Sequence, residues 1–497
     1  MYVMSVLWDA LNDVSVLTIC LLLLSLGIAL FYEMINGFHD TANAVAMIIY
    51  THSMKAKYSV IMSGIMNFLG VLLGGIGVAY AIVHLLPLDL MVETNQNAAL
   101  AMVYSLLIAA VVWNFGTWYF ALPVSSSHSL IGSIIGVSTT FGLLHGFDLA
   151  HSVNWKVVYT ILIGLALSPL IGAGFSFILM KLARKYITNP KLFRSPSQEE
   201  KRKHPSFLAR MAIVATGAGV SFAHGSNDGQ KGIGLIMIIL IGILPGYYAL
   251  DMSSHHYKIA HIRDAANNLS RFYADNNATL IQLVNGKRLM SALKTKNTIA
   301  ECSVDQVDTT LALVASKING LNSYADLTMK ERWSMRTAIL CSDHFFAQAE
   351  KAYLLIDKDK SDYISHERKQ LVAATEYAPY WVVFAVALAI GIGTMIGYKR
   401  IVHTIGEKIG SNEINYMQGT VAQTTAMITI LAANVLHAPV STTHILSSAV
   451  TGSMLSKSEG GVQKGTIKVI LLSWLFTLPV TALMGSGIYI CLNFFMK

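Results

Sequence analysis

Long apolar runs alternate with short polar breaks along most of this chain, and the breaks are rich in Gly and Pro. A helix crosses the hydrocarbon core of a bilayer with about 20 apolar residues, and ten windows approach that length. They lie at 15–34, 59–84, 98–120, 124–145 and 155–181 in the first half and at 209–224, 379–398, 416–436, 440–456 and 467–493 in the second. The pattern predicts an all-α polytopic membrane protein. Two shorter apolar stretches, 41–50 and 231–250, are compatible with full spans, half helices or re-entrant segments.

Two polar motifs occur twice, once in each half of the chain. The tetrapeptide PVSS at 123–126 matches PVST at 439–442, and GFHDTAN at 37–43 is echoed by GSNDGQK at 225–231. In each half the Asp motif precedes the Pro-Ser motif. Repeated halves with Gly- and Pro-broken polar stretches at matching positions are typical of secondary transporters. We therefore expect two structural repeats with broken or re-entrant helices.

The second half also carries an insertion. From Asp40 to Pro123 is 83 positions and from Asp228 to Pro439 is 211, an excess of 128 that equals the length of segment 249–376. This segment is charged and shows helical stretches, so we expect an inserted helical domain outside the membrane. The predicted parts are an N-terminal membrane repeat at 1–182, a basic cytoplasmic linker at 183–208, the first part of the C-terminal repeat at 209–248, the insert at 249–376 and the rest of that repeat at 377–497.

Composition supports the membrane assignment and gives an orientation. The chain is 54% hydrophobic and 13% charged, whereas soluble domains are about 25% charged. Its formal charge of +8 lies mostly in short loops near 55–57, 399–408 and 457–468 and in the linker, where positive charge indicates the cytoplasmic side rather than nucleic-acid binding. If 41–50 and 231–250 are re-entrant, all four basic segments fall on one side. The halves are then inverted relative to each other, with both termini and the insert outside the cytoplasm.

The four cysteines divide between the insert and the membrane windows. Cys302 and Cys341 lie in the insert, so a disulfide is an open alternative if the compartment is oxidising. Cys20 and Cys491 lie in apolar windows, where packing is the simplest role.

The duplicated Pro-Ser motif has the composition of an anion site. A proline at the first helical position leaves backbone N–H groups unpaired beside several hydroxyls, and the helix dipole adds partial positive charge. The alternative is a Pro kink whose hydroxyls bond back to carbonyls. The predicted substrate-binding hydroxyls are Ser125, Ser126, Ser127, Ser441, Thr442 and Thr443.

Asp40 and Asp228 are costly residues at membrane depth, where an ionised carboxylate costs about 2.5–3.5 kcal/mol. With Asn43, Asn227 and carbonyls freed at the neighbouring glycines, each Asp is predicted to ligate a small cation or to take a proton. The alternative is that each merely caps a helix at an aqueous end.

For other polar residues near the motifs the sequence gives less indication of a functional role. For His128, His224 and His444 a structural hydrogen bond is favoured over a proton relay. Glu33, seven residues before Asp40, is another acid in an apolar window. Its counterpart in the second half is Ser221, so we assign it no definite role. No catalytic residue and no firm metal site are predicted.

At the two duplicated motifs the chain resembles the inorganic phosphate transporter (PiT) family, whose repeats carry Gly-Ala-Asn-Asp-Val-Ala-Asn-Ala-like and Pro-Val-Ser-Thr-Thr-like motifs. It is most similar to the enteric bacterial low-affinity branch. The resemblance covers about 1–248 and 377–497, not the insert. It implies phosphate bound between the halves at the hydroxyl triplets, coupling ions at the Asp and Asn residues, and alternating access.

The departures from the family pattern concern ion coupling. Phe38 and His39 replace Ala and Asn in the first motif, and Lys231 stands where the second motif has its second Asn. An ammonium there would repel sodium and pair with Asp228 or with phosphate. We therefore expect proton coupling, or transport of a neutral metal–phosphate complex, rather than sodium coupling.

Taken together, these features predict a multi-pass inner-membrane symporter that imports inorganic phosphate, not an enzyme. A sulfate or other tetrahedral oxyanion permease on the same scaffold is the alternative, and a phosphate sensor or channel is a second one. No cofactor is expected. The expected partners are inorganic phosphate, protons, the lipid bilayer and, in the metal–phosphate alternative, Mg²⁺ or another divalent cation. Nucleic acid is not expected, and a homo-oligomer stays open.

Overall fold

The structure is a computed structural model that describes residues 14–86, 96–146, 149–195, 206–284, 307–404, 409–410, 413–456 and 461–496, with only the backbone at 41–43, 96, 150, 151 and 400. Cys302 and the side chain of Asn43 therefore lie outside the described residues. Within these ranges the chain is helical, and the one β feature is an isolated bridge between Gly410 and Val462. The all-α prediction is confirmed.

The chain divides into two units. The membrane unit comprises Leu23–Leu86, Asn97–Ile238 and Tyr380–Lys497, and the inserted unit is built mainly on Ile239–Pro379. The inserted unit therefore begins ten residues before the predicted insert and ends three residues after it.

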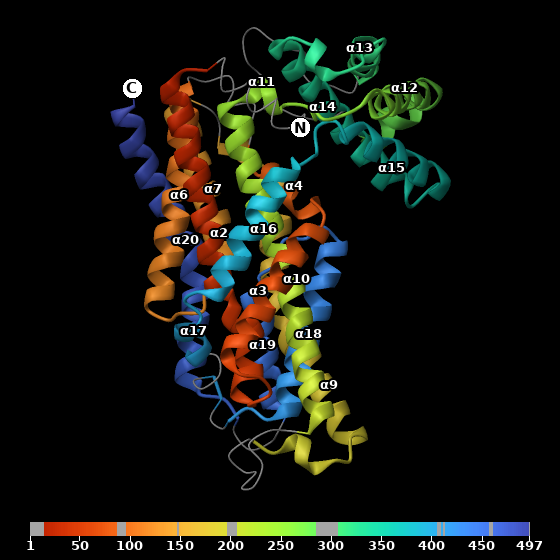
Figure 1. The fold of residues 1–497 in the computed structure, drawn as a ribbon. Coiled ribbons are helices and arrows are strands. Elements are labelled where there is room, and N and C mark those ends of the chain that lie inside the picture. Colours follow the sequence, from red (N-terminus) through yellow and green to blue (C-terminus); the bar gives the residue numbers. More distant parts are fainter. Residues whose placement is uncertain are drawn as a thin grey trace. The chain divides into compact units, whose positions relative to one another are not determined.

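The helices of the first membrane half follow most of the predicted windows (Figure 1). They are α2 (Val16–Tyr50), α3 (Ala56–Leu73), α4 (Gly77–Val83), α6 (Gln96–Tyr119), α7 (Ser126–Leu144), α8 (Leu149–Ser152) and α9 (Trp155–Tyr186), followed by the 3₁₀ turn η1 (Pro190–Phe193). The second half contains α10 (Phe207–Ile243), α16 (Tyr380–Met395), α17 (Lys399–His403), α18 (Tyr416–Val435), α19 (Thr442–Leu455) and α20 (Lys464–Phe495). Of the described helices, α2, α3, α6, α7, α9, α10 and α20 are long and apolar enough to cross a membrane.

The two Asp motifs lie inside continuous helices. Helix α2 runs through the stretch 41–50 to Tyr50, and α10 runs through most of 231–250 to Ile243, so the half-helix and re-entrant alternatives are wrong. Because the helix continues past Gly37 and Gly225, the expected freeing of carbonyls does not occur. The glycines serve close packing instead. A Cβ at Gly37 would lie 2.4 Å from the Ile390 carbonyl oxygen on α16, and one at Gly225 would lie 2.2 Å from that of Asn67 on α3.

Helices do break elsewhere, at matching places in the two halves. The window 59–84 is divided into α3 and α4 at Gly75, whose φ of +78° suits glycine. Before each Pro-Ser motif the chain takes a left-handed residue, Ala121 with φ 55° and His437 with φ 51°. Each lies two residues before the motif's proline, and non-glycine residues adopt this conformation only where the surrounding structure enforces it.

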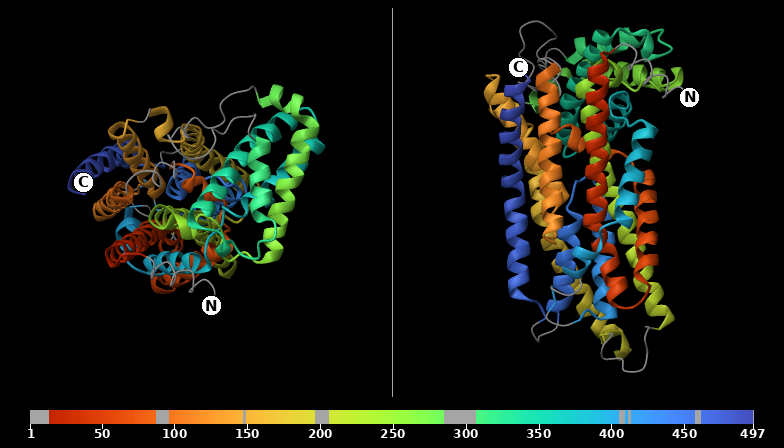
Figure 2. Two further views of the ribbon diagram at one scale, coloured as in Figure 1. Left: turned by 90° about the horizontal axis from the view of Figure 1, so that it is seen from above. Right: turned by 60° about the vertical axis from the view of Figure 1, so that its left-hand side comes forward.

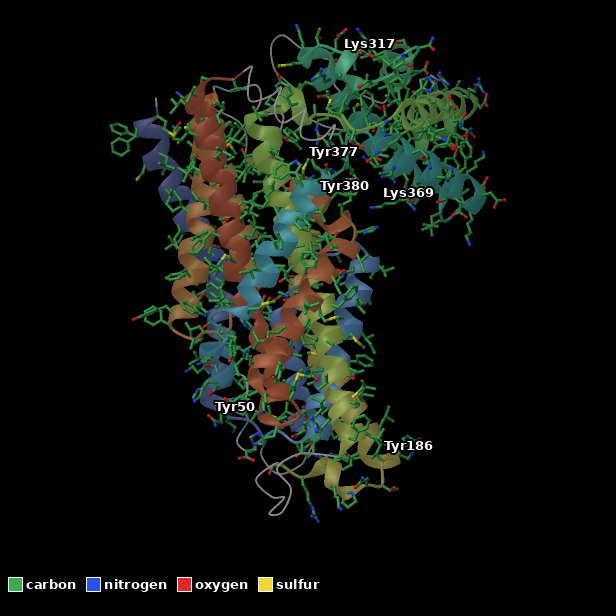
Figure 3. All side chains as sticks on the ribbon, in the orientation of Figure 1. Tyr50, Tyr186, Lys317, Lys369, Tyr377 and Tyr380 are labelled. Carbon is green, nitrogen blue, oxygen red and sulfur yellow. The ribbon has the colours of Figure 1, made fainter. Side chains whose placement is uncertain are left out.

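Helices of each half pack on helices of the other half. Helix α7 of the first half packs on α20 of the second, α19 of the second half packs on α9 of the first, and α3 packs on α16. Tyr50 and Tyr186, the last residues of α2 and α9, lie toward the same end of the membrane unit (Figure 3), whereas α20 ends near the C-terminus at the opposite end (Figure 1). The last helices of the two halves, α9 and α20, therefore run in opposite directions.

The inserted unit is a helical bundle. It contains α11 (Pro245–Tyr248), α12 (His256–Val284), α13 (Val307–Ile318), the 3₁₀ turn η5 (Tyr324–Asp326), α14 (Met329–Tyr353) and α15 (Lys358–Val372). Helices α12, α14 and α15 lie side by side (Figure 2, left) and bury Leu269, Phe345 and Ile364 in one apolar core. Cys341 of α14 is disulfide-bonded, whereas Cys20 and Cys491 are free. The helical character predicted for the insert is confirmed.

Candidate functional site

The two Pro-Ser motifs form capped helix N-termini. The Ser125 side chain accepts a hydrogen bond from the His128 N–H at 3.3 Å, and the Ser441 side chain accepts one from the His444 N–H at 3.2 Å. These serines are therefore N-caps, and the prediction that a proline occupies the first helical position is wrong. Pro123 lies two residues before its cap, outside the helix. The hydroxyl residues at both helix starts are buried.

Both predicted aspartates contact the N-terminus of α19. The Thr442 hydroxyl donates to Asp228 Oδ2 at 3.1 Å and lies 3.4 Å from Asp40 Oδ2, and the Thr443 hydroxyl donates to Asp40 Oδ1. Both carboxyl groups are buried. A helix N-terminus favours negative charge, so in this arrangement the protein's own carboxylates use donors that a bound oxyanion would use.

His224 lies between the two aspartates. Its Nε2 is 3.2 Å from Asp228 Oδ2 and 3.4 Å from Asp40 Oδ2. On the other side of the ring, Nδ1 lies 2.7 Å from Asn67 Oδ1, and the Asn67 amide donates to Thr394 at 3.0 Å. These side chains orient the imidazole, so the favoured structural hydrogen bond is present. Sequence reasoning nevertheless missed that this histidine belongs to the site. Its place four residues before Asp228, on the same helix face, was the available signal.

Among the described residues, one group of potential metal ligands lies close enough together to hold an ion. It consists of Asp40, His224 and Asp228. One ligand atom from each lies within 4.8 Å of the others. Two carboxylates and an imidazole fit a small cation.

Lys231 joins this cluster to the first Pro-Ser helix. Its ammonium donates to Asp228 Oδ1 at 2.5 Å, to the Ser127 hydroxyl at 2.6 Å and to the Val440 carbonyl oxygen at 2.7 Å. The side chain is 2% exposed. The expected pairing with Asp228 is therefore present, and the ammonium occupies a position surrounded by three oxygens.

Other predicted site residues lie apart from this cluster. The Asn227 amide donates to Asn434 Oδ1 on α18 at 2.5 Å, although its own Oδ1 is buried without a hydrogen-bond partner. The Ser126 carbonyl accepts from the Tyr32 hydroxyl at 3.0 Å. Of the predicted site side chains, the structure thus brings together Asp40, Asp228, Lys231, Ser127, Thr442 and Thr443.

Gln230 has a structural role that the sequence did not indicate. Its amide oxygen accepts the Val78 N–H of α4 at 2.8 Å, and its amide nitrogen donates to the Gly74 carbonyl at 2.8 Å. The residue beside Lys231 therefore holds the break between α3 and α4. Nothing in the local sequence distinguished it from an ordinary polar helix residue.

The rings of His128 and His444 contact each other at a tilt, with their centroids 4.6 Å apart. His444 stacks on Trp474 at 3.9 Å. The Trp474 indole donates to the Pro123 carbonyl at 3.0 Å. The expected hydrogen bond is absent at His128 Nδ1, which is buried without a partner. These rings tie α7, α19 and α20 together where the two Pro-Ser motifs meet.

Comparison with known proteins gives this arrangement its context. The model of the phosphate transporter family matches residues 36–485. The chain belongs to the phosphate transporter family. Within it, the chain is 43% identical to the low-affinity inorganic phosphate transporter PitA of Escherichia coli K12 over 482 residues, covering 94% of this chain and 96% of that protein. It is 44% identical over 476 residues to a low-affinity inorganic phosphate transporter of Buchnera aphidicola from Acyrthosiphon pisum, again covering 94% and 96%.

A solved structure supports the fold of this family member. The sodium-dependent phosphate transporter matches with a TM-score of 0.53 at 18% identity, covering 96% of this chain and 99% of that one. The family resemblance expected from the duplicated motifs is confirmed. As a family member with apolar membrane helices, the chain is a multi-pass inner-membrane phosphate transporter and not an enzyme.

Proposed function

We propose that the chain imports inorganic phosphate by proton symport with alternating access, and that the oxyanion binds at the facing N-termini of α7 and α19. One observation above all supports this proposal: two buried aspartates, a buried lysine and the hydroxyls of both capped helix starts converge in the membrane unit. Hydroxyl and backbone donors at a helix N-terminus are suited to an oxyanion.

Phosphate at this place requires a compensating positive charge. Thr442 and Thr443 already bind Asp40 and Asp228, so an incoming oxyanion lies beside two carboxylates. Like charges in a site of low polarity repel strongly. A co-transported proton reduces this repulsion, and a divalent cation held by the aspartates and His224 would do the same. The same electrostatics thus favours proton symport and, as the alternative, transport of a metal–phosphate complex.

The position of Lys231 argues against sodium as the coupling ion. Its ammonium already takes the oxygens of Asp228, Ser127 and Val440. A sodium ion at this place would have to displace a tethered cation. We therefore do not expect this protein to share the sodium dependence of the solved relative.

Uptake of radiolabelled phosphate into proteoliposomes tests this proposal. With an imposed proton gradient and no sodium, we expect accumulation that a protonophore abolishes. Dependence on added magnesium would favour the metal–phosphate complex. Accumulation only after sodium is added would refute proton coupling.

The same vesicles separate the alternatives. Inhibition by arsenate but not by sulfate supports a phosphate site, whereas the reverse pattern supports a sulfate permease. Accumulation against a gradient excludes a sensor or a channel, because neither concentrates its substrate.

The aspartates are proposed to act in coupling and not as structural caps. We expect Asp40→Asn and Asp228→Asn each to abolish accumulation while the protein still inserts. Asn keeps the shape and an acceptor oxygen but loses the charge. Near-normal accumulation by either variant, measured at equal protein per vesicle, would return that residue to a capping role.

We also propose that the inserted unit faces the periplasm. The basic linker before α10 marks the cytoplasmic side, so the segment after this spanning helix lies on the other side. The disulfide at Cys341 supports this orientation, since disulfides persist in oxidising compartments. Labelling of an engineered cysteine at Lys317 by an impermeant maleimide in whole spheroplasts tests it, and labelling only after lysis would contradict it.

A further inference from the structure

Glu33 is a buried acid that none of the roles above uses. It lies on α2, seven residues before Asp40, and is 0% exposed. Its Oε2 has one hydrogen bond, from the Asn36 side-chain amide at 3.4 Å. Its Oε1 is buried without a hydrogen-bond partner, and so is the amide oxygen of Asn36.

The contacts of Glu33 differ from those of the two aspartates. Asp40 and Asp228 receive hydroxyl hydrogen bonds and lie beside His224, and Asp228 also pairs with Lys231. No ion pair of the described residues includes Glu33. An ionised carboxylate with one long hydrogen bond is expensive at membrane depth. A single proton on the Glu33 carboxyl group removes its charge. The proton also supplies an O–H donor in a place where Glu33 Oε1 and Asn36 Oδ1 are buried without a hydrogen-bond partner.

Glu33 nevertheless lies close to the site. A Cβ at Gly232 would fall 2.5 Å from the carboxyl carbon of Glu33 and 2.7 Å from its Oε1. The carboxyl group therefore packs directly on the backbone of α10, one residue after Lys231. The charged groups of α10 that act on it electrostatically are Asp228, Lys231 and His224. On its own helix, the neighbouring titratable group is Tyr32.

We propose that Glu33 carries the coupled proton, an inference that rests on the proton symport proposed above. The carboxylate takes one proton from the side on which phosphate enters, and the carboxylic acid releases it on the other side. No bond to phosphate forms or breaks in this step. The proton thus travels on a carboxyl group beside the anion site.

Glu33→Gln is the test, because glutamine imitates the protonated acid and cannot release a proton. With one proton per phosphate, a gradient of one pH unit supports about tenfold accumulation in the wild type. We expect the variant to lose this tenfold accumulation and stop at equilibration, while phosphate–phosphate exchange, which needs no net proton movement, stays within about twofold of wild type.

Controls keep this test separate from that of proton symport. Glu376→Gln, an equally conservative change outside the membrane helices, should accumulate like wild type. If the wild type ignores the pH gradient, proton symport fails whatever the variant does. If the wild type responds and Glu33→Gln accumulates equally well, the role of Glu33 is overturned while symport stands.

Two further outcomes decide between coupling and a structural role. Loss of exchange together with accumulation, at an unchanged thermal midpoint, would overturn the proposal in favour of a role in binding. Should the glutamine variant fail to fold, Glu33→Asp retains an ionisable group and is expected to keep gradient-driven accumulation with a displaced pH profile. An unchanged profile would overturn the proposal.

Discussion

Replacing Lys231 with asparagine tests whether the buried ammonium takes the place of a coupling cation. The wild-type side chain is 2% exposed and bonds to Asp228, Ser127 and Val440 at 2.5–2.7 Å. Removing one partner of a buried ion pair costs about 3–5 kcal/mol, because the remaining charge is left uncompensated. The free energy of unfolding of the Lys231→Asn variant should fall by this amount in a medium that lacks small cations.

Sodium should restore part of that loss in the variant alone. The asparagine carbonyl adds an oxygen to those of Asp228, Ser127 and Val440, which makes a cation site where the ammonium was. A ligand present at 100 times its dissociation constant stabilises the folded state by about 2.7 kcal/mol. We therefore expect the variant's thermal midpoint to be higher in sodium chloride than in choline chloride at equal ionic strength, and wild type to show no difference.

The assay is thermal unfolding of purified protein in detergent, with Lys317→Asn as the matched control. Lys317 also pairs with a carboxylate, Glu331 at 2.6 Å, but it is 43% exposed, so its loss should cost no more than about 1 kcal/mol. Lys231 does not take the place of a cation if Lys231→Asn unfolds at the wild-type midpoint in choline, or if sodium stabilises wild type as much as the variant.

Three other predictions follow from single contacts. Gly37→Ala should destabilise the membrane unit by about 1–3 kcal/mol because the added Cβ meets the backbone of α16. Gly27→Ala on the same helix should not destabilise it, because nothing lies within 4 Å of that Cβ. Equal thermal midpoints of the two variants would contradict the role of Gly37 in packing. Thr442→Ala should weaken the inhibition of labelled uptake by unlabelled phosphate by about tenfold or more. Thr451→Ala, which loses only a hydrogen bond to the Ser447 carbonyl, should leave this inhibition unchanged. Equal effects of the two variants would contradict a role of Thr442 in phosphate binding. Burial and the Asp343 carboxylate raise the pKa of Glu376 to about 7. The free energy of unfolding of the inserted unit should therefore fall by up to about 3 kcal/mol as the pH rises from about 4.5 to above 7. An unfolding midpoint of Glu376→Gln that does not change over this range would fit this assignment, whereas the wild-type pH profile in the variant would contradict it.

The outline of the architecture could be predicted from the amino-acid sequence. Apolar windows, duplicated motifs and a charged insertion are properties of composition and spacing, which the chain carries wherever it folds. They predicted a helical membrane protein of two halves, the insert, and the residues Asp40, Asp228, Lys231, Ser127, Thr442 and Thr443 that lie together in the structure. The Pro-Ser motifs lie beside both helix starts, although each helix begins three residues after the proline.

How these residues meet became visible in the folded molecule and not before. Local signals could not tell whether Gly37 breaks its helix or permits close packing, because that depends on Ile390 of α16, which is distant along the chain. Nor could they place His224 between two aspartates, or Thr443 on Asp40, a pair separated by 403 positions. Such contacts depend on which helix faces are buried against each other. Spacing along one segment describes that segment's own faces, whereas the partner of each face is set by the packing of the whole bundle.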